Sequence, residues 1–303
     1  MKYNDGQRVI HALCPNWGIG MVYNDDYASD KNKIFFENEG EKIIIINTPD
    51  IILVTGKKAD SVILDNYLPP SLTIKKLPSY FSISHSSKLF LKTYPNGFND
   101  KNYLKDIRSF IEENHNYAFS KLNKTSLKKL INNNKWNEVC DIAKDIMSYK
   151  PKNYKKNNLN LVDGYFHRFE IIPFQKGLKA PSNQKLFSNN LYELLYGKYN
   201  IEDRFNSYLQ MLSDIKCLNW PLVTYFLFII YPDEFLLVRP TWLIKTSEIF
   251  RYDIKYKSEV NFNSYDCMLK FSIYLKGQLK LLKPKDLIDI YSFIWFIHKS
   301  TSI

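Results

Sequence analysis

The sequence is short of glycine and cysteine, and each shortage excludes classes of site. Only 10 of the 303 residues are glycine, and no glycine-rich phosphate loop, dinucleotide fingerprint or nucleophile elbow is present. The glycine-rich hairpin of helical DNA glycosylases is also missing. The 4 cysteines form no Cys-x-x-Cys pair, which argues against a disulfide framework or a zinc knuckle. We therefore expect no metal and no cofactor.

Long apolar runs are absent as well. The longest, from Pro221 to Tyr231, holds about 11 residues and is too short to cross a bilayer. No signal-peptide pattern opens the sequence. His11 and Cys14 have ligand-like spacing, but two ligands do not make a metal site, and the 5 histidines share no common spacing. These absences predict a cytoplasmic protein that does not contact a membrane.

The chain is rich in aromatic residues and in positive charge. Aromatic residues make up 16% and hydrophobic residues 45% of the sequence, enough for a packed core, and the length allows one small and one ordinary domain. The formal net charge of +11 is unevenly placed: −3 over residues 1–54, +10 over 55–160 and +4 over 161–303. This asymmetry predicts a basic surface for a polyanion in the middle of the chain.

Short β-type runs fill the first fifty or so residues. Gly, Asn and Asp separate them, as expected for turns between strands. The runs span residues 6–11, 15–22, 33–37 and 41–46, and an Ile-Ile-Leu-Val strand follows at 51–54. Gly18 and Gly20 allow the second strand to bend, while Trp17 caps a small core. The pattern predicts a minimal twisted barrel. The consecutive isoleucines at 43–46 cannot all face one way, so we expect the rest of the chain to cover the second face.

Three motifs in this part follow one another in a recognisable order. They are Arg-Val-Ile-His from Arg8, Trp-Gly-Ile-Gly-x-Val from Trp17 and Ile-Phe-Phe-Glu-Asn-x-Gly-x-Lys from Ile34. Residues 5–54 thereby resemble the small Tudor-like or SH3-like barrel at the C-terminus of UvrD/PcrA-type helicases, and most of all a bacterial module of unknown function. The same barrel type occurs in CarD-like transcription regulators. The resemblance implies a surface that docks RNA polymerase or a repair protein, and no active site.

Four apolar residues of this module are the expected contacts with a protein partner. They are Trp17, Ile19, Phe35 and Ile44. An exposed strand edge would accept a strand from the partner. On the alternative interpretation, Trp17 and the glycines beside it only determine the fold.

The composition changes twice after the last strand. Prolines and serines between residues 57 and 99 predict a linker that wraps over the domains. From Asp100 onward, apolar residues recur at three- and four-residue steps, which predicts amphipathic helices, the second with an N-cap at Thr125 or Ser126. The expected fold is α+β: an SH3/Tudor-like β-barrel at 1–56, the linker at 57–99 and a larger all-α helical domain at 100–303. The expected helices include 103–122, 127–131, 139–147, 191–197, 205–212, 220–230 and 284–295.

Lysines gather on the second of these helices and in the loop after the third. A tyrosine among lysines suits a nucleic-acid backbone with bases nearby. The residues expected to contact phosphates are Lys128, Lys129, Lys150, Lys152, Tyr154, Lys155 and Lys156. A solvated loop between helices is the plainer alternative.

Two later segments carry weaker resemblances. The segment from Tyr231 to Thr241 resembles part of helical domains in bacterial restriction, repair and defence proteins. The segment from Pro284 to Trp295 is similar to the closing helix of uncharacterised proteins that carry the same barrel. Neither resemblance implies an activity.

An acidic site is the competing hypothesis. Asp286 and Asp289 share a helix face, and with Arg239 they would line the pocket of a metal-dependent nucleic-acid-processing enzyme. No Glu-x-Lys motif accompanies them, and Asp286 equally suits the first turn of a helix.

The leading interpretation is a non-enzymatic, DNA-associated accessory protein of repair, transcription or phage defence. Its barrel would dock a protein partner, such as RNA polymerase, a helicase or a subunit of a defence complex. Its basic helical face would contact nucleic acid. A pure protein–protein adaptor is the third hypothesis.

Overall fold

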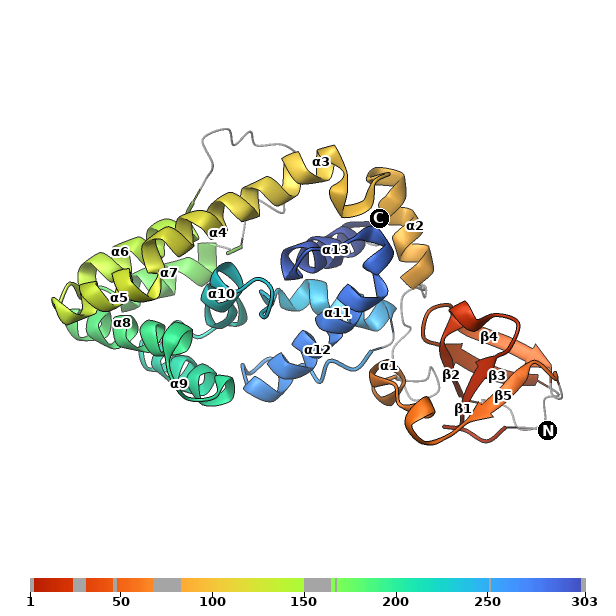
Figure 1. The fold of residues 1–303 in the computed structure, drawn as a ribbon. Coiled ribbons are helices and arrows are strands. Elements are labelled where there is room, and N and C mark those ends of the chain that lie inside the picture. Colours follow the sequence, from red (N-terminus) through yellow and green to blue (C-terminus); the bar gives the residue numbers. More distant parts are fainter. Residues whose placement is uncertain are drawn as a thin grey trace.

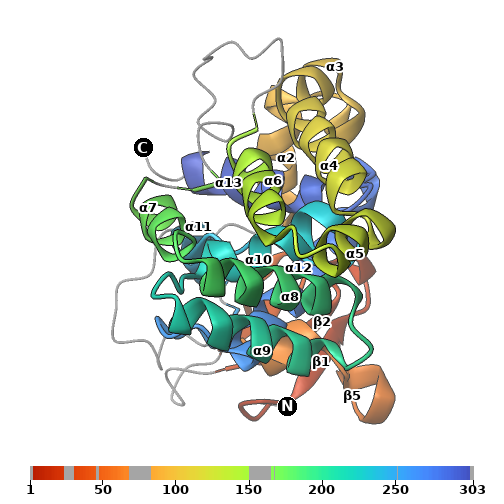
Figure 2. The ribbon, with the colours of Figure 1, turned by 90° about the vertical axis from the view of Figure 1, so that its left-hand side faces the viewer.

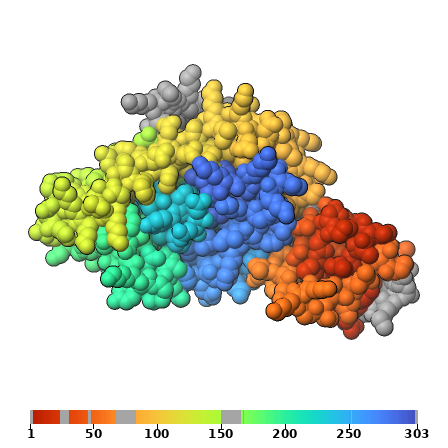
Figure 3. All heavy atoms as spheres, viewed as in Figure 1, coloured from red at the N-terminus to blue at the C-terminus, as the bar shows by residue number. Residues whose placement is uncertain are grey.

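The computed structural model places a small sheet at one end of an elongated helical body (Figure 1). It describes residues 3–23, 31–45, 48–67, 83–149, 165–166, 168–250 and 252–300. In the space-filling view the sheet forms a lobe on the helical body (Figure 3). The expected α+β class, with strands first and helices after, is confirmed.

The sheet is antiparallel, and its five strands lie where the sequence predicts them. Their order is β4-β3-β2-β1-β5, so β4 and β5 are the two edges. Among the described residues these edges do not pair with each other, and the sheet is therefore open where a barrel was expected. The strands are β1 (Arg8–His11), β2 (Ile19–Val22), β3 (Lys31–Phe36), β4 (Gly40–Ile45) and β5 (Ile51–Val54).

The two faces of the sheet pack in two different hydrophobic cores. The inner face holds a separate small core, with Trp17 and Ile44 at its margin. That core consists of Val9, Val22, Ile34, Phe36 and Ile51. On the other face, Phe35 stacks on Tyr67 with ring centroids 3.8 Å apart, and this contact joins the sheet to the main core of the molecule.

Gly20 lies where β2 crosses the inner core. A Cβ atom at this position would be 2.6 Å from the Ile34 Cγ2 atom and 2.8 Å from the Phe36 ring. No side chain fits in that space, so glycine is required for close approach of the strands. Gly18, with φ of 77°, supplies the bend before β2.

Both described stretches of the predicted linker, 57–67 and 83–99, contain helices. These are η2 (Gly56–Ala59), α1 (Val62–Asp65), α2 (Ile83–Thr93) and η4 (Gly97–Asn99). Phe90 of α2 is fully buried and contacts Phe293 and Phe296 at centroid distances of 5.6 and 5.2 Å. The described residues after 83 therefore belong to the helical body.

The helical body follows the periodicity of the sequence. Its elements are α3 (Lys101–Tyr103), the π-helical turn η5 (Leu104–Arg108), α4 (Ser109–Leu122), α5 (Lys124–Asn132), α6 (Trp136–Met147), α7 (Arg168–Gly177), α8 (Pro181–Tyr196), α9 (Ile201–Asp214), α10 (Trp220–Ile230), α11 (Pro240–Ile249), α12 (Phe262–Gln278), η6 (Lys280–Leu282) and α13 (Leu287–Ser300). In Figure 2, α8 and α9 lie side by side. None of the described helices is long and apolar enough to span a membrane.

Two helix starts show how local chemistry sets the boundaries. The prediction that Thr125 or Ser126 caps α5 is wrong, because the Asn123 side chain accepts the Ser126 N–H at 3.0 Å. Asparagine one turn earlier is the better cap. At α10, Pro221 occupies the first turn, as expected, and Asn219, which was not predicted as a cap, caps the helix.

Candidate functional site

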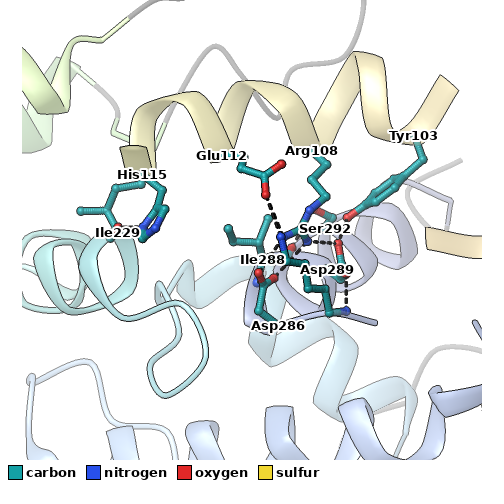
Figure 4. Close-up of polar contacts among 10 residues, drawn as sticks. Tyr103, Arg108, Glu112, His115, Ile229, Asp286, Ile288, Asp289 and Ser292 are labelled. Atoms are coloured by element: carbon teal, nitrogen blue, oxygen red, sulfur yellow. Dashed lines mark hydrogen bonds and ion pairs between the residues drawn. The ribbon is translucent and has the colours of Figure 1, made fainter. Parts of the chain in front are cut away.

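The two aspartates of the proposed acidic site converge on an arginine that the sequence did not single out (Figure 4). Arg108, at the end of η5, is 4% exposed. Its Nη1 and Nη2 atoms donate to the two oxygens of Asp286 at 3.1 and 2.6 Å. The same Nη1 donates to Asp289 Oδ1 at 2.6 Å. Both aspartates stand at the start of α13, so the guanidinium ties this helix to η5.

Further donors complete the cluster. The Tyr103 hydroxyl donates to Asp289 Oδ1 at 2.5 Å, and the Lys285 N–H donates to Asp289 Oδ2 at 2.7 Å. The Ile288 N–H donates to Asp286 Oδ1 at 3.0 Å, which is the helix-start role considered for this residue. Every carboxylate oxygen of the pair thus accepts a hydrogen bond from a protein group.

The electrostatics of the cluster follow from its burial. Burial raises the pKa of Asp289, while Arg108, the Tyr103 hydroxyl and the Lys285 N–H oppose that shift. A guanidinium held by two carboxylates is a strong, directional arrangement. It also occupies the carboxylate oxygens that a magnesium ion would need, so the cluster acts as a structural tie between η5 and α13.

Arg239, the third residue of the proposed acidic site, lies in a different ion pair. Its Nη1 atom donates to Glu170 Oε2 at 2.9 Å and to the Tyr165 carbonyl at 3.0 Å. No hydrogen bond or ion pair joins it to either aspartate in the described part of the chain. Nor does any group of three or more His, Cys, Asp or Glu residues there have the arrangement to hold a metal.

The expected partner contacts on the sheet divide into two groups. Trp17, Ile19 and Ile44 are half-buried. Phe35 is 1% exposed, because it stacks on Tyr67 of this chain, and it is not accessible to a partner. Trp17 packs on His11 and Phe36 at centroid distances of 4.7 and 5.1 Å, which is the capping position expected for it.

The aliphatic side chains that are exposed on the two edge strands are not the ones that were predicted to contact a partner. On β4, Ile44 turns inward, while its neighbours Ile43 and Ile45 pair with Lys33 and Lys31 of β3 and point outward. The exposed fractions are 59% for Ile43, 63% for Ile45, 47% for Ile52 and 44% for Leu53. The expectation that the rest of the chain covers this outer face is wrong for β4, among the residues described.

The lysines of α5 are exposed, as a binding face requires. Lys128 and Lys129 both face solvent. Lys124, at the start of the same helix, is also exposed. The remaining predicted phosphate contacts, Lys150, Lys152, Tyr154, Lys155 and Lys156, lie outside the described residues.

Comparison with known proteins concerns the sheet alone. Residues 4–54 match a family described as "Protein of unknown function (DUF3553)", and this match spans all five strands of the sheet. Comparisons with curated proteins and with solved structures gave no significant match. The first part of this chain is therefore similar to a family defined by sequence, and the family description assigns it no activity.

Proposed function

We propose that this chain is a non-enzymatic, DNA-associated accessory protein in repair, transcription or phage defence. Its sheet, a Tudor/SH3-like docking module, binds a protein partner, and its helical body contacts nucleic-acid phosphates through basic residues. One observation carries the proposal: both edge strands of the sheet expose aliphatic side chains, Ile43 and Ile45 on β4 and Ile52 and Leu53 on β5.

An edge strand with apolar side chains is suited to strand addition. Its main-chain groups bind an extended peptide, and its outward side chains supply affinity and selectivity. Full burial of one isoleucine is worth about 1.5–3 kcal/mol.

The strand order supports a kinship with SH3-like barrels. The last strand, β5, lies next to the first, β1, which is the arrangement from which a small barrel closes. The glycine-dependent approach of β2 to β3 supplies the curvature that closure needs. These features agree with the docking role inferred for the Trp-Gly-Ile-Gly module.

The molecule is long enough to use two contacts at once. The sheet and α5 lie at opposite ends of the structure (Figure 1). A weak protein contact at one end and a weak phosphate contact at the other would combine through effective concentration, without any new contact being made.

The test is a binding titration of purified RNA polymerase and, separately, a purified UvrD-type helicase against this protein. We expect one of them to bind and the double substitution Ile43→Lys and Ile45→Lys to weaken that binding at least tenfold, about 1.4 kcal/mol. Ile273→Lys with Leu281→Lys is the matched control, because Ile273 on α12 and Leu281 in η6 are 53% and 87% exposed. Equal affinity of the edge variant and the parent would rule out docking through β4.

A further inference from the structure

A pocket of about 360 Å³ opens between α4, α5 and α6. α5 and α6 lie with the end of α4 on the side of the molecule away from the sheet (Figure 1). Lys121, Lys129 and Lys135 lie on its walls, and Leu130 and Ile142 give it an apolar part.

The three lysines bring more positive charge to the pocket than the surroundings neutralise. No carboxylate belongs to the described lining of the pocket. Lys135 pairs with Glu138 at 2.8 Å, and the Lys121 ammonium lies over the Tyr117 ring, 5.7 Å from its centroid. For Lys129 no ion pair occurs among the described residues. Like charges gathered around one opening repel each other unless an anion lies between them.

The other lining residues narrow the chemistry of that anion. The Ser126 side chain adds a hydroxyl group to the wall, and hydroxyl and ammonium groups together suit phosphate oxygens. The volume of about 360 Å³ leaves room beyond a single phosphate. Leu130 and Ile142 offer that remaining space an apolar surface, which suits a sugar or a base.

We infer that this pocket binds one nucleotide of a single-stranded nucleic acid, with its phosphate among the three lysines and its sugar or base against Leu130 and Ile142. The inference rests on the proposed nucleic-acid contact and gives it a location and a strand preference. A paired and stacked nucleotide in a duplex cannot enter a pocket, whereas an unpaired one is free to do so. The exposed Lys124 and Lys128 on α5 would hold the flanking backbone.

The test compares two charge-matched double variants by fluorescence anisotropy with a labelled oligothymidylate and with a duplex of equal length. Lys121→Gln with Lys129→Gln removes two charges from the pocket. Lys179→Gln with Lys198→Gln removes two exposed charges outside it. We expect the parent to prefer the single strand and the pocket variant to bind it roughly tenfold more weakly, with the salt slope reduced by about 1.4. The control should change binding less than about twofold.

Competition separates the nucleotide from simple phosphate. Thymidine monophosphate should displace the oligonucleotide from the parent more effectively than inorganic phosphate at the same ionic strength. Parent-like binding by the pocket variant, equal losses in both variants, or equal affinity for duplex and single strand would overturn the inference and leave the proposed nucleic-acid contact standing elsewhere. A parent that binds neither nucleic acid would overturn both.

Discussion

The sheet and the helical body differ in where their exposed apolar side chains lie. In the body, every residue of α10 is buried, and the main core reaches from Met21 and Phe35 of the sheet to α13. The sheet has a separate core of 5 buried residues, while 4 of its aliphatic side chains lie exposed on the two edges. The exposed apolar side chains of the body, such as Phe169 on α7 and Ile273 on α12, stand on separate helices, whereas those of the sheet stand in pairs on its two edge strands.

The ion pairs of the two regions differ in how deeply they are buried. Arg108 and both of its aspartates are buried within the body. In the sheet, Arg8 Nη2 donates to Asp65 of α1 at 2.8 Å, but the Asp65 side chain is 61% exposed. A solvated carboxylate loses little when its partner leaves, whereas a buried one is left without compensation. Matched substitutions in the two regions should therefore have unequal costs.

The largest effect is expected from Arg108→Met. The substitution leaves Asp286 and Asp289 buried beside each other without the cation between them, and we expect a loss of about 3–5 kcal/mol in the free energy of unfolding. Arg8→Met, its counterpart in the sheet, should cost less than about 1 kcal/mol. Urea unfolding followed by circular dichroism measures both. If the two variants lost the same stability, the contrast between a buried and a solvated tie would be wrong.

A second comparison uses one substitution in both regions. Gly20→Ala places a methyl group 2.6 Å from Ile34 in the sheet and should destabilise the protein by about 1–3 kcal/mol. Gly277→Ala, near the end of α12, meets no atom within 4 Å and should stabilise by up to about 1 kcal/mol, because alanine is the better helix former. Thermal unfolding of the two variants gives the sign of each change. If the Gly20→Ala protein were as stable as the parent, β2 and β3 would be able to move apart to make room for the methyl group.

The sequence predicts elements whose signal is local. All five strands follow from short apolar runs between turn residues, and α10 follows from one apolar run with an early proline. The same signal does not fix solvent exposure. The run at 43–46 shows that its residues alternate in direction, but only the fold reveals that nothing described covers Ile43 and Ile45.

The partner of the aspartates could not be predicted, because the contact joins distant parts of the chain. Arg108 and Asp286 are separated by 178 positions. Two acidic residues on an otherwise apolar helix indicate that a buried cation or donor exists, since buried carboxylates require one. Several lysines and arginines satisfy that requirement equally in sequence. The choice of Arg108 comes from the helical body as a whole.

The smallest change in the free energy of unfolding is expected from substitution of Glu112. This residue lies at the edge of the Arg108 cluster, where the ion pairs become exposed to solvent. Its Oε1 atom accepts a hydrogen bond from Lys285 Nζ at 2.9 Å, and this bond, together with Arg108, lowers the pKa of Glu112. The side chain is 38% exposed, so Glu112→Gln should cost less than about 1 kcal/mol at pH 7.

The pH dependence of this variant fixes the sign of the interaction. A carboxylate whose pKa is lower in the folded protein than in the unfolded chain stabilises the fold when the pH is above its unfolded pKa, which is ordinarily 4.5 for a residue such as Glu112. This contribution is lost as the pH falls through the folded pKa. The stability difference between parent and Glu112→Gln should therefore be present at pH 7 and shrink below about pH 4.5. Urea titrations at several pH values measure it. A stability difference that stays constant with pH would mean that Glu112 acts through the packing of its side chain, and that the charge of its ion pair with Lys285 contributes nothing to stability.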